Sequence, residues 1–565
     1  MKIAGLGLLP SSSFPSHETG NQRLPPHNHT TTLNTMNSAT PGNLKPWLLP
    51  ILSGVLIGTS YIPFPPWASL FCFIPLWIFW NQQTRLKNVF LGGMITSFVF
   101  TLIGFNWVTY LLHEFAHLDW PVAVIGMLVY GLIAHLFVPL AGVLWFWGRN
   151  KFQWSKRLSL WLMALITILC EAYSLTLFDW NFGYSWYGAN IPVYHWAEVI
   201  GFSGLSAATL LCNLPLYMAW EQRKQNAGKI ILATVVTGFI LLNIGGLWLK
   251  NRLPQPDASF KTLMIQAYIE NAEKLAAELG KGYGKEIFNR YITLTDNALK
   301  THQDAKIDFA MWPETAFPAL LGEQFKFDPY PVALAQFLHD RQLPLITGAY
   351  SVEEESRLIT NSLFVLNKDG EIVPPHYSKS ILLAFGEYIP GEQLFPEIRK
   401  WLPPTGHFAR GHGPTDLLHW NGYKMGAQIC YESLFPGFTR SLAELGAQFI
   451  VNVTNDSWYG AWQEPYQHMY MTLARGVEFR RPVLRVTNTG ISTVSLASGE
   501  ILERSPIHQT WAGLYEVPYL KNPPATFYQN WFWLVPGLLW GALVLLLGIG
   551  VVNRLGNNDT RSARN

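Results

Sequence analysis

The sequence predicts a multi-span α-helical membrane domain, with about eight spans, joined to a soluble α/β domain. The composition is the first indication: aromatic residues make up 14% of the 565 residues, 24 of them are tryptophans, and only 14% are charged. This is typical of a membrane protein that carries a substantial soluble part. The second indication is a series of apolar runs, and the third is a long segment that alternates strand-like and helical patterns. At this length at least two domains are expected.

Residues 1–45 are rich in Ser, Thr, Asn, His and Pro and have little apolar periodicity. We expect them to form a disordered N-terminal extension. They lack the charged start, apolar centre and small-residue cleavage site of a signal peptide. A true start at Met36 stays open as an alternative.

Residues 46–253 are predicted to form a membrane domain with seven spans. The apolar stretches lie at about 47–63, 67–81, 88–112, 121–147, 158–178, 193–220 and 229–249. Most are long enough to cross about 30 Å of hydrocarbon as helices. The first two are short and meet at Pro63-Phe64-Pro65-Pro66, which predicts a tight hairpin or a re-entrant pair. Residues 527–552 are predicted to form a C-terminal transmembrane helix, followed by a cytoplasmic tail at 553–565.

The basic residues of the connecting loops predict the orientation, because cytoplasmic loops are enriched in Lys and Arg. The loops after the second, fourth and sixth stretches contain such residues: Arg85, Lys87, Arg149, Lys151, Lys156, Arg157, Arg223, Lys224 and Lys229. The alternate loops, 113–120 and 178–192, contain none. We therefore expect the N-terminus to lie inside and segment 254–526 to lie on the extracytoplasmic side.

Segment 254–526 alternates two patterns. Strand-like runs occur at 263–269, 307–313, 343–350, 362–366, 425–430, 449–454, 483–487 and 493–497. Helical patterns occur at 271–300, 331–342, 436–446 and 465–480. This predicts an extracytoplasmic α/β domain whose strands are buried by helices.

Cysteine usage and charge exclude several classes of protein. Three of the four cysteines, Cys72, Cys170 and Cys212, lie inside apolar runs, which leaves Cys430 alone in polar sequence. One such thiol can build neither a disulfide framework nor a multi-cysteine metal site. A net charge of +3 without a basic stripe gives no reason to expect nucleic-acid binding.

Three ionisable residues fall at or near membrane depth. Glu171 lies deep within a predicted span, and we expect it to hydrogen-bond to a neighbouring helix or to the loop at 179–184. His195 and Glu198 lie close to a predicted helix start, where water can reach them.

Glu314, Lys379 and Cys430 stand in or near the places where predicted strands end. A thiol that attacks an acyl carbon needs a base that takes its proton and returns it to the leaving group. The tetrahedral oxyanion needs a positive donor, and a lysine ammonium can serve. Taken singly each residue is weak evidence, since a lone cysteine is more often an inert buried side chain and most Glu and Lys are solvated surface groups.

The motifs containing these residues resemble a known family. Trp312-Pro313-Glu314, Lys379 and Ile429-Cys430-Tyr431-Glu432 occur in the order of the Glu-Lys-Cys triad of the nitrilase superfamily. The arrangement of seven spans, a domain and one span, together with the segments 385–390 and 455–460, resembles the apolipoprotein N-acyltransferase family within it.

The resemblance implies an α-β-β-α sandwich whose site faces the membrane. It implies that Glu314 is the general base and acid, Lys379 the oxyanion partner and Cys430 the nucleophile. Glu387 would orient Lys379 or shuttle a proton, and Tyr431 and Glu432 would shape the site.

The same resemblance implies a ping-pong acyl transfer that needs no cofactor or metal. An acyl chain would move from a phospholipid, usually phosphatidylethanolamine, to the enzyme cysteine as a thioester. It would then pass to the free amine of a diacylglyceryl-cysteine at the N-terminus of an apolipoprotein.

Apolar irregular segments near the candidate triad support a lipid substrate. They lie at 316–321 and 394–404, and we expect them to form lids that dip into the outer leaflet. The alternative is that they cover the domain core. The lipid-facing candidates are Phe317, Leu321, Phe385, Trp401, Trp458 and Tyr459.

Two other functions stay open at this stage. One is a membrane-anchored amidase or nitrile hydrolase that uses the same triad but releases the acyl group to water. The other is a transporter with an outer ligand-binding domain, although the sequence lacks the internal symmetry typical of transporters.

Overall fold

The computed structural model describes residues 45–176, 178, 180–278, 280, 282–384, 386–400 and 406–562. The predicted disorder of the N-terminal extension falls on residues 1–44 and lies outside this range. The described chain forms one unit, Lys45–Asn565, apart from the first 44 residues.

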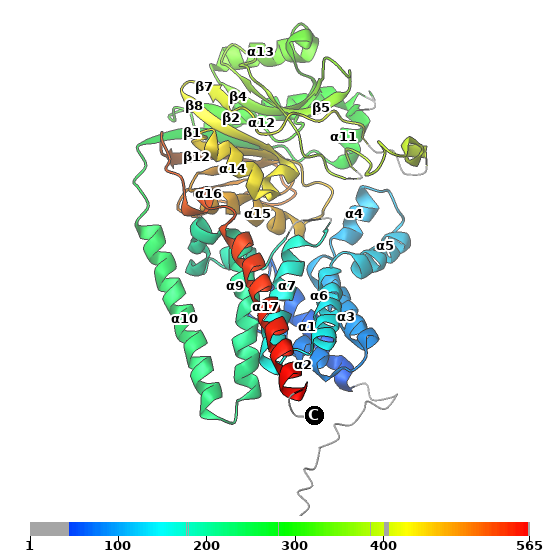
Figure 1. The fold of residues 1–565 in the computed structure, drawn as a ribbon. Helices are drawn as coiled ribbons and strands as arrows, with labels where there is room; N and C mark the ends of the chain where they lie inside the picture. Colours follow the sequence, from blue (N-terminus) through cyan, green and yellow to red (C-terminus); the bar gives the residue numbers. More distant parts are fainter. Residues whose placement is uncertain are drawn as a thin grey trace, which may run out of the picture. The chain divides into compact units, whose positions relative to one another are not determined.

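The membrane domain is a bundle of helices of very different lengths (Figure 1). Its α-helices are α1 (Leu48–Gly58), α2 (Ile74–Gln82), α3 (Leu86–Gly104), α4 (Val108–Glu114), α5 (Trp120–Ile133), α6 (Phe137–Phe152), α7 (Lys156–Tyr173), α8 (Tyr184–Gly188), α9 (Ala197–Glu221), α10 (Asn226–Asn251) and α17 (Leu534–Ser562). Two 3-10 helices, η1 (Lys45–Trp47) and η2 (Pro192–Trp196), precede α1 and α9.

Five helical segments of the described chain are long and apolar enough to cross a membrane. They are Leu86–Gly104, Trp120–Phe152, Pro192–Glu221, Asn226–Asn251 and Leu534–Val552. The first two stretches that the sequence marks as apolar form the short helices α1 and α2, of 11 and 9 residues, joined by turns. Such lengths cannot cross the hydrocarbon core singly, so the count of eight spans stays a prediction.

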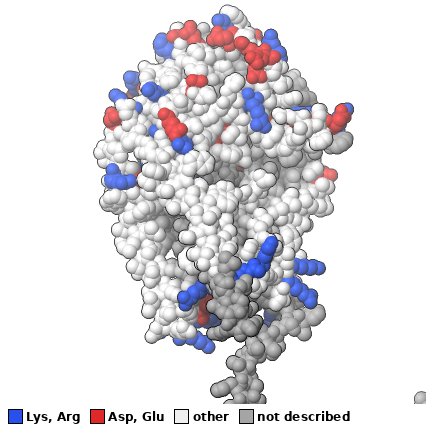
Figure 2. Space-filling model, in the orientation of Figure 1, with Lys and Arg blue, Asp and Glu red and all other residues white. Residues whose placement is uncertain are grey.

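Charged residues are absent from a broad belt of the face seen in Figure 2. Acidic and basic side chains gather at one end of this face, and mainly basic side chains gather at the other. An uncharged belt is what a helical bundle needs where lipid covers it.

The soluble domain contains two β-sheets. The first has the order β12-β1-β2-β4-β5-β6, with β3 beside β4, and the second has the order β11-β10-β9-β8-β7. The strands of the first sheet are β1 (Ala258–Gln266), β2 (Phe309–Met311), β3 (Phe317–Leu320), β4 (Leu345–Val352), β5 (Ile359–Leu366), β6 (Tyr377–Ser378) and β12 (Trp511–Tyr519). Those of the second are β7 (Leu418–Trp420), β8 (Tyr423–Ile429), β9 (Phe449–Thr454), β10 (Val483–Thr487) and β11 (Thr493–Ser495).

Helices cover the outer faces of both sheets. The helices of this domain are α11 (Asn271–Glu278), α12 (Tyr283–Thr301), α13 (Pro329–Arg341), α14 (Pro436–Glu444), α15 (Glu464–Phe479) and α16 (Phe527–Asn530), with the 3-10 helices η3 (Glu323–Phe325), η4 (Pro396–Lys400) and η5 (Cys430–Leu434). Side chains alternate along β1: Leu263 packs in the cluster that contains α12, whereas Phe260 stacks 4.6 Å from Phe449 of the second sheet. The α-β-β-α sandwich that the sequence predicts is therefore confirmed.

Helix α15 joins the soluble domain to the membrane helices. All its residues except Tyr466 are buried, and Gln467 donates to the carbonyl oxygens of Ile62 and Gly104 at 2.8 Å each. Near the other end of the helix, the Glu478 carboxylate accepts from the backbone N–H of Phe202 at 2.9 Å. Buried polar groups that are paired in this way fix how the soluble domain packs on the membrane helices.

Candidate active site

The three candidate catalytic side chains lie just beyond strand ends. Glu314 follows β2, Lys379 follows β6, and Cys430 opens η5 directly after β8. The loop that carries Glu314 passes close against Gly348 of β4: a Cβ there would lie 2.5 Å from the Thr315 nitrogen and 2.6 Å from the Pro313 oxygen. Only glycine allows this approach, so Gly348 helps to set the position of Glu314.

Lys379 lies between two carboxylates. Its Nζ is 2.9 Å from Glu387 Oε1 and 3.4 Å from Glu314 Oε1, and its side chain is 2% exposed. Burial disfavours the ammonium, but the neighbouring charges of Glu387, Glu314 and Cys430 outweigh burial and raise the pKa of Lys379 well above its usual value. Lys379 is therefore a fixed positive charge at this site.

Asn361 connects the two glutamates, and sequence reasoning did not find it. Its Nδ2 donates to Glu314 Oε1 at 2.7 Å and to Glu387 Oε1 at 3.3 Å, while its backbone oxygen accepts from the Lys379 N–H at 2.8 Å. The only signal in the sequence is a polar residue between Thr360 and Ser362 at the start of β5, which is too common to be diagnostic.

Cys430 occupies a strained turn between β8 and η5. Its φ is +51°, in the left-handed region that non-glycine residues rarely adopt, and the residue is 7% exposed. Burial and the Glu314 carboxylate raise the pKa of the Cys430 thiol, and Lys379 and the Thr454 hydroxyl offset this only in part. The thiol is therefore protonated at neutral pH and needs a base before it can attack.

Glu432 ties the turn of Cys430 to the segment that follows Lys379. Its side chain is fully buried; Oε2 accepts from the Ile429 N–H at 2.9 Å, and Oε1 accepts from the Tyr377 hydroxyl at 2.6 Å. Oε1 also accepts from the Ser380 N–H at 2.7 Å, the Ser380 hydroxyl at 3.0 Å and the Ile381 N–H at 3.1 Å. The Glu432 carboxylate thus fixes the turn of Cys430 and the segment around Lys379 relative to each other.

Cys430 borders a mainly apolar cavity that both halves of the molecule build. The cavity measures about 460 Å³ including its open mouth. Membrane-domain residues Tyr61, Phe105, Trp107, Phe178 and Trp180 line it together with Cys430, Tyr431, Leu434, Tyr459, Glu464, Gln467, His468 and Met471 of the soluble domain. The Cys430 thiol therefore borders an opening whose lining is suited to contact with an apolar ligand.

The structure places the lipid-facing candidates in different surroundings. Tyr459 lines the cavity beside Cys430, with its ring 5.5 Å from that of Trp107, and Trp458 is half-buried against Phe115 at 5.2 Å. Tyr431 is half-buried, with its ring 5.1 Å from that of Phe435. Phe385 and Trp401 lie outside the described residues.

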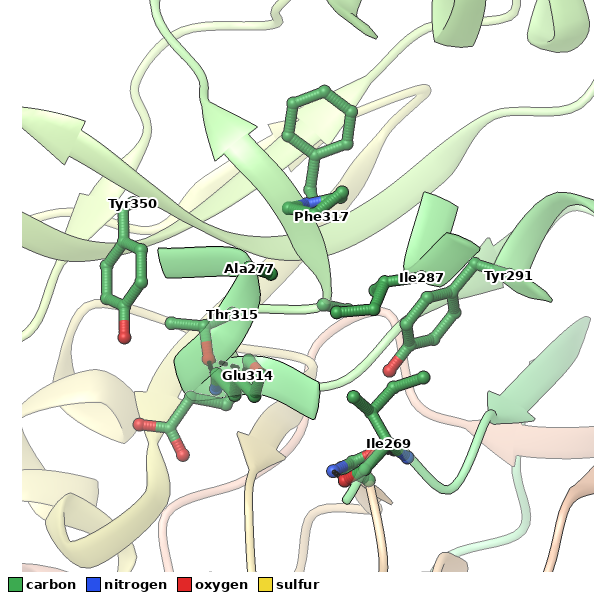
Figure 3. A pocket seen from close by; sticks show the side chains of 12 residues that line it. Ile269, Ala277, Ile287, Tyr291, Glu314, Thr315, Phe317 and Tyr350 are labelled. Carbon is green, nitrogen blue, oxygen red and sulfur yellow. Dashed lines mark hydrogen bonds between the residues drawn. The ribbon is translucent and has the colours of Figure 1, made fainter. Parts of the chain in front are cut away.

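The expectation that Phe317 and Leu321 belong to an exposed lid is wrong. They are 1% and 3% exposed and belong to the apolar core beneath α12, because the segment adds strand β3 to the edge of β4. Phe317 instead borders a pocket of about 440 Å³ that also reaches Glu314 (Figure 3). In the second predicted lid segment, Leu394 and Phe395 are 78% and 70% exposed.

A buried cluster of charged residues lies next to the cavity. Asp456, Glu464 and His468 place ligand atoms within 4.8 Å of one another, as a metal site would require. However, the Arg485 guanidinium already lies 2.7 Å from Asp456 Oδ2, and His468 Nδ1 is 3.0 Å from Asp456 Oδ1. A fixed positive charge at this position disfavours a cation, so the cluster fits a buried ion pair better than a metal site.

The ionisable residues of the membrane domain have structural partners. Glu171 accepts a hydrogen bond from Ser206 of α9 at 2.7 Å, which confirms the expected contact with a neighbouring helix. Glu198 is only 4% exposed and lies between Arg252 and Arg480, at the wall of an open pocket. His195 is 2% exposed, and its Nδ1 lies 3.3 Å from Arg480 Nη2.

The two-sheet fold is that of a carbon–nitrogen hydrolase domain, and it is attached to a membrane domain. The carbon-nitrogen hydrolase family model matches residues 253–511, and the model of the apolipoprotein N-acyltransferase N-terminal domain matches residues 53–214. A curated apolipoprotein N-acyltransferase from Bdellovibrio bacteriovorus is 41% identical over 525 residues, which cover 91% of this chain and 94% of that protein. The chain belongs to the apolipoprotein N-acyltransferase family.

Other similar proteins match either most of the chain or about half of it. The apolipoprotein N-acyltransferase from Geobacter metallireducens is 28% identical over 477 residues, which cover 82% of this chain and 88% of that protein. Among solved structures, an amidase mutant of the nitrilase superfamily from Nesterenkonia AN1 is 18% identical, with a TM-score of 0.34, over 47% of this chain and 93% of the amidase.

Proposed function

We propose that this chain transfers an acyl chain from a phospholipid, through a thioester on Cys430, to the N-terminal amine of diacylglyceryl-cysteine apolipoproteins. The observation that supports this most strongly is the apolar cavity beside Cys430, which is lined by side chains of the membrane helices. Membership of the apolipoprotein N-acyltransferase family supports the same reaction class.

In the first half-reaction, Glu314 takes the proton of the Cys430 thiol, and the sulfur attacks the ester carbonyl carbon of the phospholipid. Lys379, held cationic by its two carboxylate neighbours, stabilises the oxyanion that forms. As the tetrahedral intermediate collapses, the ester C–O bond breaks and Glu314 returns its proton to the departing lysophospholipid oxygen. The acyl chain remains on Cys430 as a thioester, with its tail in the apolar cavity.

In the second half-reaction, the free amine of the diacylglyceryl-cysteine attacks the thioester carbonyl. Glu314 takes a proton from the attacking nitrogen, and Lys379 again stabilises the oxyanion. Collapse breaks the C–S bond and forms an amide, while the proton on Glu314 returns to the Cys430 sulfur. The enzyme is thus restored, as a ping-pong reaction requires.

We propose phosphatidylethanolamine as the usual donor and the bacterial inner membrane as the location. The catalytic domain, residues 254–526, would lie on the periplasmic side. The Lys and Arg residues of the loops after α2, α6 and α9 support this orientation, because such loops are retained in the cytoplasm.

Product analysis tests this proposal against hydrolysis by the same triad. Purified protein would be incubated with a phospholipid and a diacylglyceryl-cysteine peptide, and the products would be quantified by mass spectrometry. An N-acylated peptide and lysophospholipid in equal amounts are expected. Free fatty acid as the main product, with no N-acylated peptide, would identify the chain as a hydrolase and refute the proposal.

A further inference from the structure

A further pocket lies where the membrane helices meet the soluble domain, distinct from the cavity beside Cys430 and the pocket beside Glu314. It measures about 1400 Å³ including its open mouth. Its lining includes Glu198, Lys250, Arg252 and Arg480, the linker at 253–256 and the segment that leads into α16. None of the catalytic residues proposed above lines it.

The pocket carries excess positive charge. Lys250, Arg252 and Arg480 face a single carboxylate, Glu198, which leaves a net charge of +2. Glu198 is shared: Oε1 lies 2.6 Å from Arg252 Nη2, and Oε2 lies 2.5 Å from Arg480 Nε. Lys250 forms no ion pair among the described residues. One carboxylate cannot neutralise three cations, so the pocket attracts an anion.

Aromatic side chains place this pocket at headgroup depth. Trp248, one turn before the end of α10, is 60% exposed, and the Arg252 guanidinium lies 4.9 Å from the centre of its ring. Trp531 and Trp533, just before α17, are 59% and 69% exposed. Exposed tryptophans beside cations at the ends of spanning helices are typical of the membrane–water interface.

Exposed apolar surface continues from the pocket toward the membrane. The candidate span Asn226–Asn251 ends in the pocket, and the span Leu534–Val552 begins shortly after the pocket residue Phe527. Only 6% of an 18-residue apolar window in each of these spans is buried. Figure 1 places the end of α10 and the start of α17 at the same level, below β1 and β12.

We propose that this pocket binds the phosphodiester headgroup of an anionic phospholipid, with its acyl chains lying along α10 and α17. The phosphate accepts hydrogen bonds from Lys250 and the arginines, and the net negative lipid matches the charge of the pocket. A zwitterionic lipid such as phosphatidylethanolamine binds more weakly, because its ammonium is repelled by the same cations.

Lipid binding to the full-length Cys430→Ser variant, in which no lipid can be consumed, tests the proposal. Native mass spectrometry would follow titration with phosphatidylglycerol, phosphatidylethanolamine or inorganic phosphate. Phosphatidylglycerol is expected to bind more tightly than phosphatidylethanolamine. Lys250→Gln should weaken phosphatidylglycerol binding about 5-fold, the effect of about one surface charge, and Lys250→Arg should restore it.

Arg223→Gln is the matched control, because Arg223 lies 4.4 Å from the Trp220 ring at the end of α9. It should leave phosphatidylglycerol binding unchanged. Unchanged binding in Lys250→Gln, or equal weakening in Arg223→Gln, would overturn the proposal. Equal affinity for phosphatidylethanolamine, or full competition by inorganic phosphate, would also overturn it.

Discussion

Replacing Glu432 with glutamine should destabilise the fold and impair catalysis together. The glutamine amide keeps one oxygen, which can serve either the Ile429 N–H or the donors around Tyr377 and Ser380, but not both. Its NH₂ group then faces a backbone or hydroxyl donor in a fully buried site. Each buried donor left unpaired costs about 1–3 kcal/mol, so a loss of about 2–4 kcal/mol is expected.

Thermal unfolding of purified protein would measure this loss, which corresponds to a decrease of about 6–12 °C in Tm. The acyl-transfer rate at 20 °C should also fall by about 100-fold, since a shift of about 1 Å between Lys379 and Cys430 has that effect. Glu444→Gln is the matched control, because Glu444 is 48% exposed and pairs with Arg440 at 2.8 Å. Its effect should stay below about 0.5 kcal/mol. A Glu432→Gln variant with wild-type Tm and rate would refute the role of Glu432.

Three further predictions concern the same domain. Gly348→Ala should lower activity by about 100-fold, because its Cβ would push the backbone on either side of Glu314, the proposed base. Gly437→Ala should be neutral, because its Cβ would meet nothing closer than 3.9 Å. Alkylation of Cys430, followed by peptide mass spectrometry, should keep accelerating as the pH rises through 9, because burial raises its pKa; a plateau below pH 8 would contradict this. Despite burial, the charge of Arg485 holds the pKa of the Asp456 carboxyl at about 2. The contribution of Asp456 to the stability of the fold is therefore complete above about pH 4 and lost toward pH 2. Between these pH values, Tm should fall less in Asp456→Asn than in the wild type.

Most strands of the soluble domain could be predicted because they are buried on both faces and read as continuous apolar runs. β9 and β10 begin and end at the predicted residues. β12 was missed: it contains Gly513 and Pro518, which normally argue against a strand, but it is an edge strand that pairs only with β1. In the membrane domain, an apolar run does not by itself give the length of a helix, because the first two runs contain the short helices α1 and α2.

The candidate catalytic residues could be predicted because they follow recognisable strands and motifs. Asn361 and Tyr377 could not, since their importance comes from side-chain pairing between segments that are distant in sequence. The segment around Phe317 was misread because an apolar stretch with a proline looks like an exposed loop. In the folded chain β3 pairs with the interior strand β4, and the side chains of Phe317 and Leu321 are buried.

The most direct test of the proposed reaction is a search for an acyl adduct on Cys430. Purified protein would be incubated with phospholipid alone, digested and analysed by mass spectrometry. The proposal predicts a peptide containing Cys430 that carries one acyl chain through a thioester labile to hydroxylamine, with no adduct in Cys430→Ser. Continued N-acylation of a diacylglyceryl-cysteine peptide by Cys430→Ser, without any adduct at this position, would contradict it.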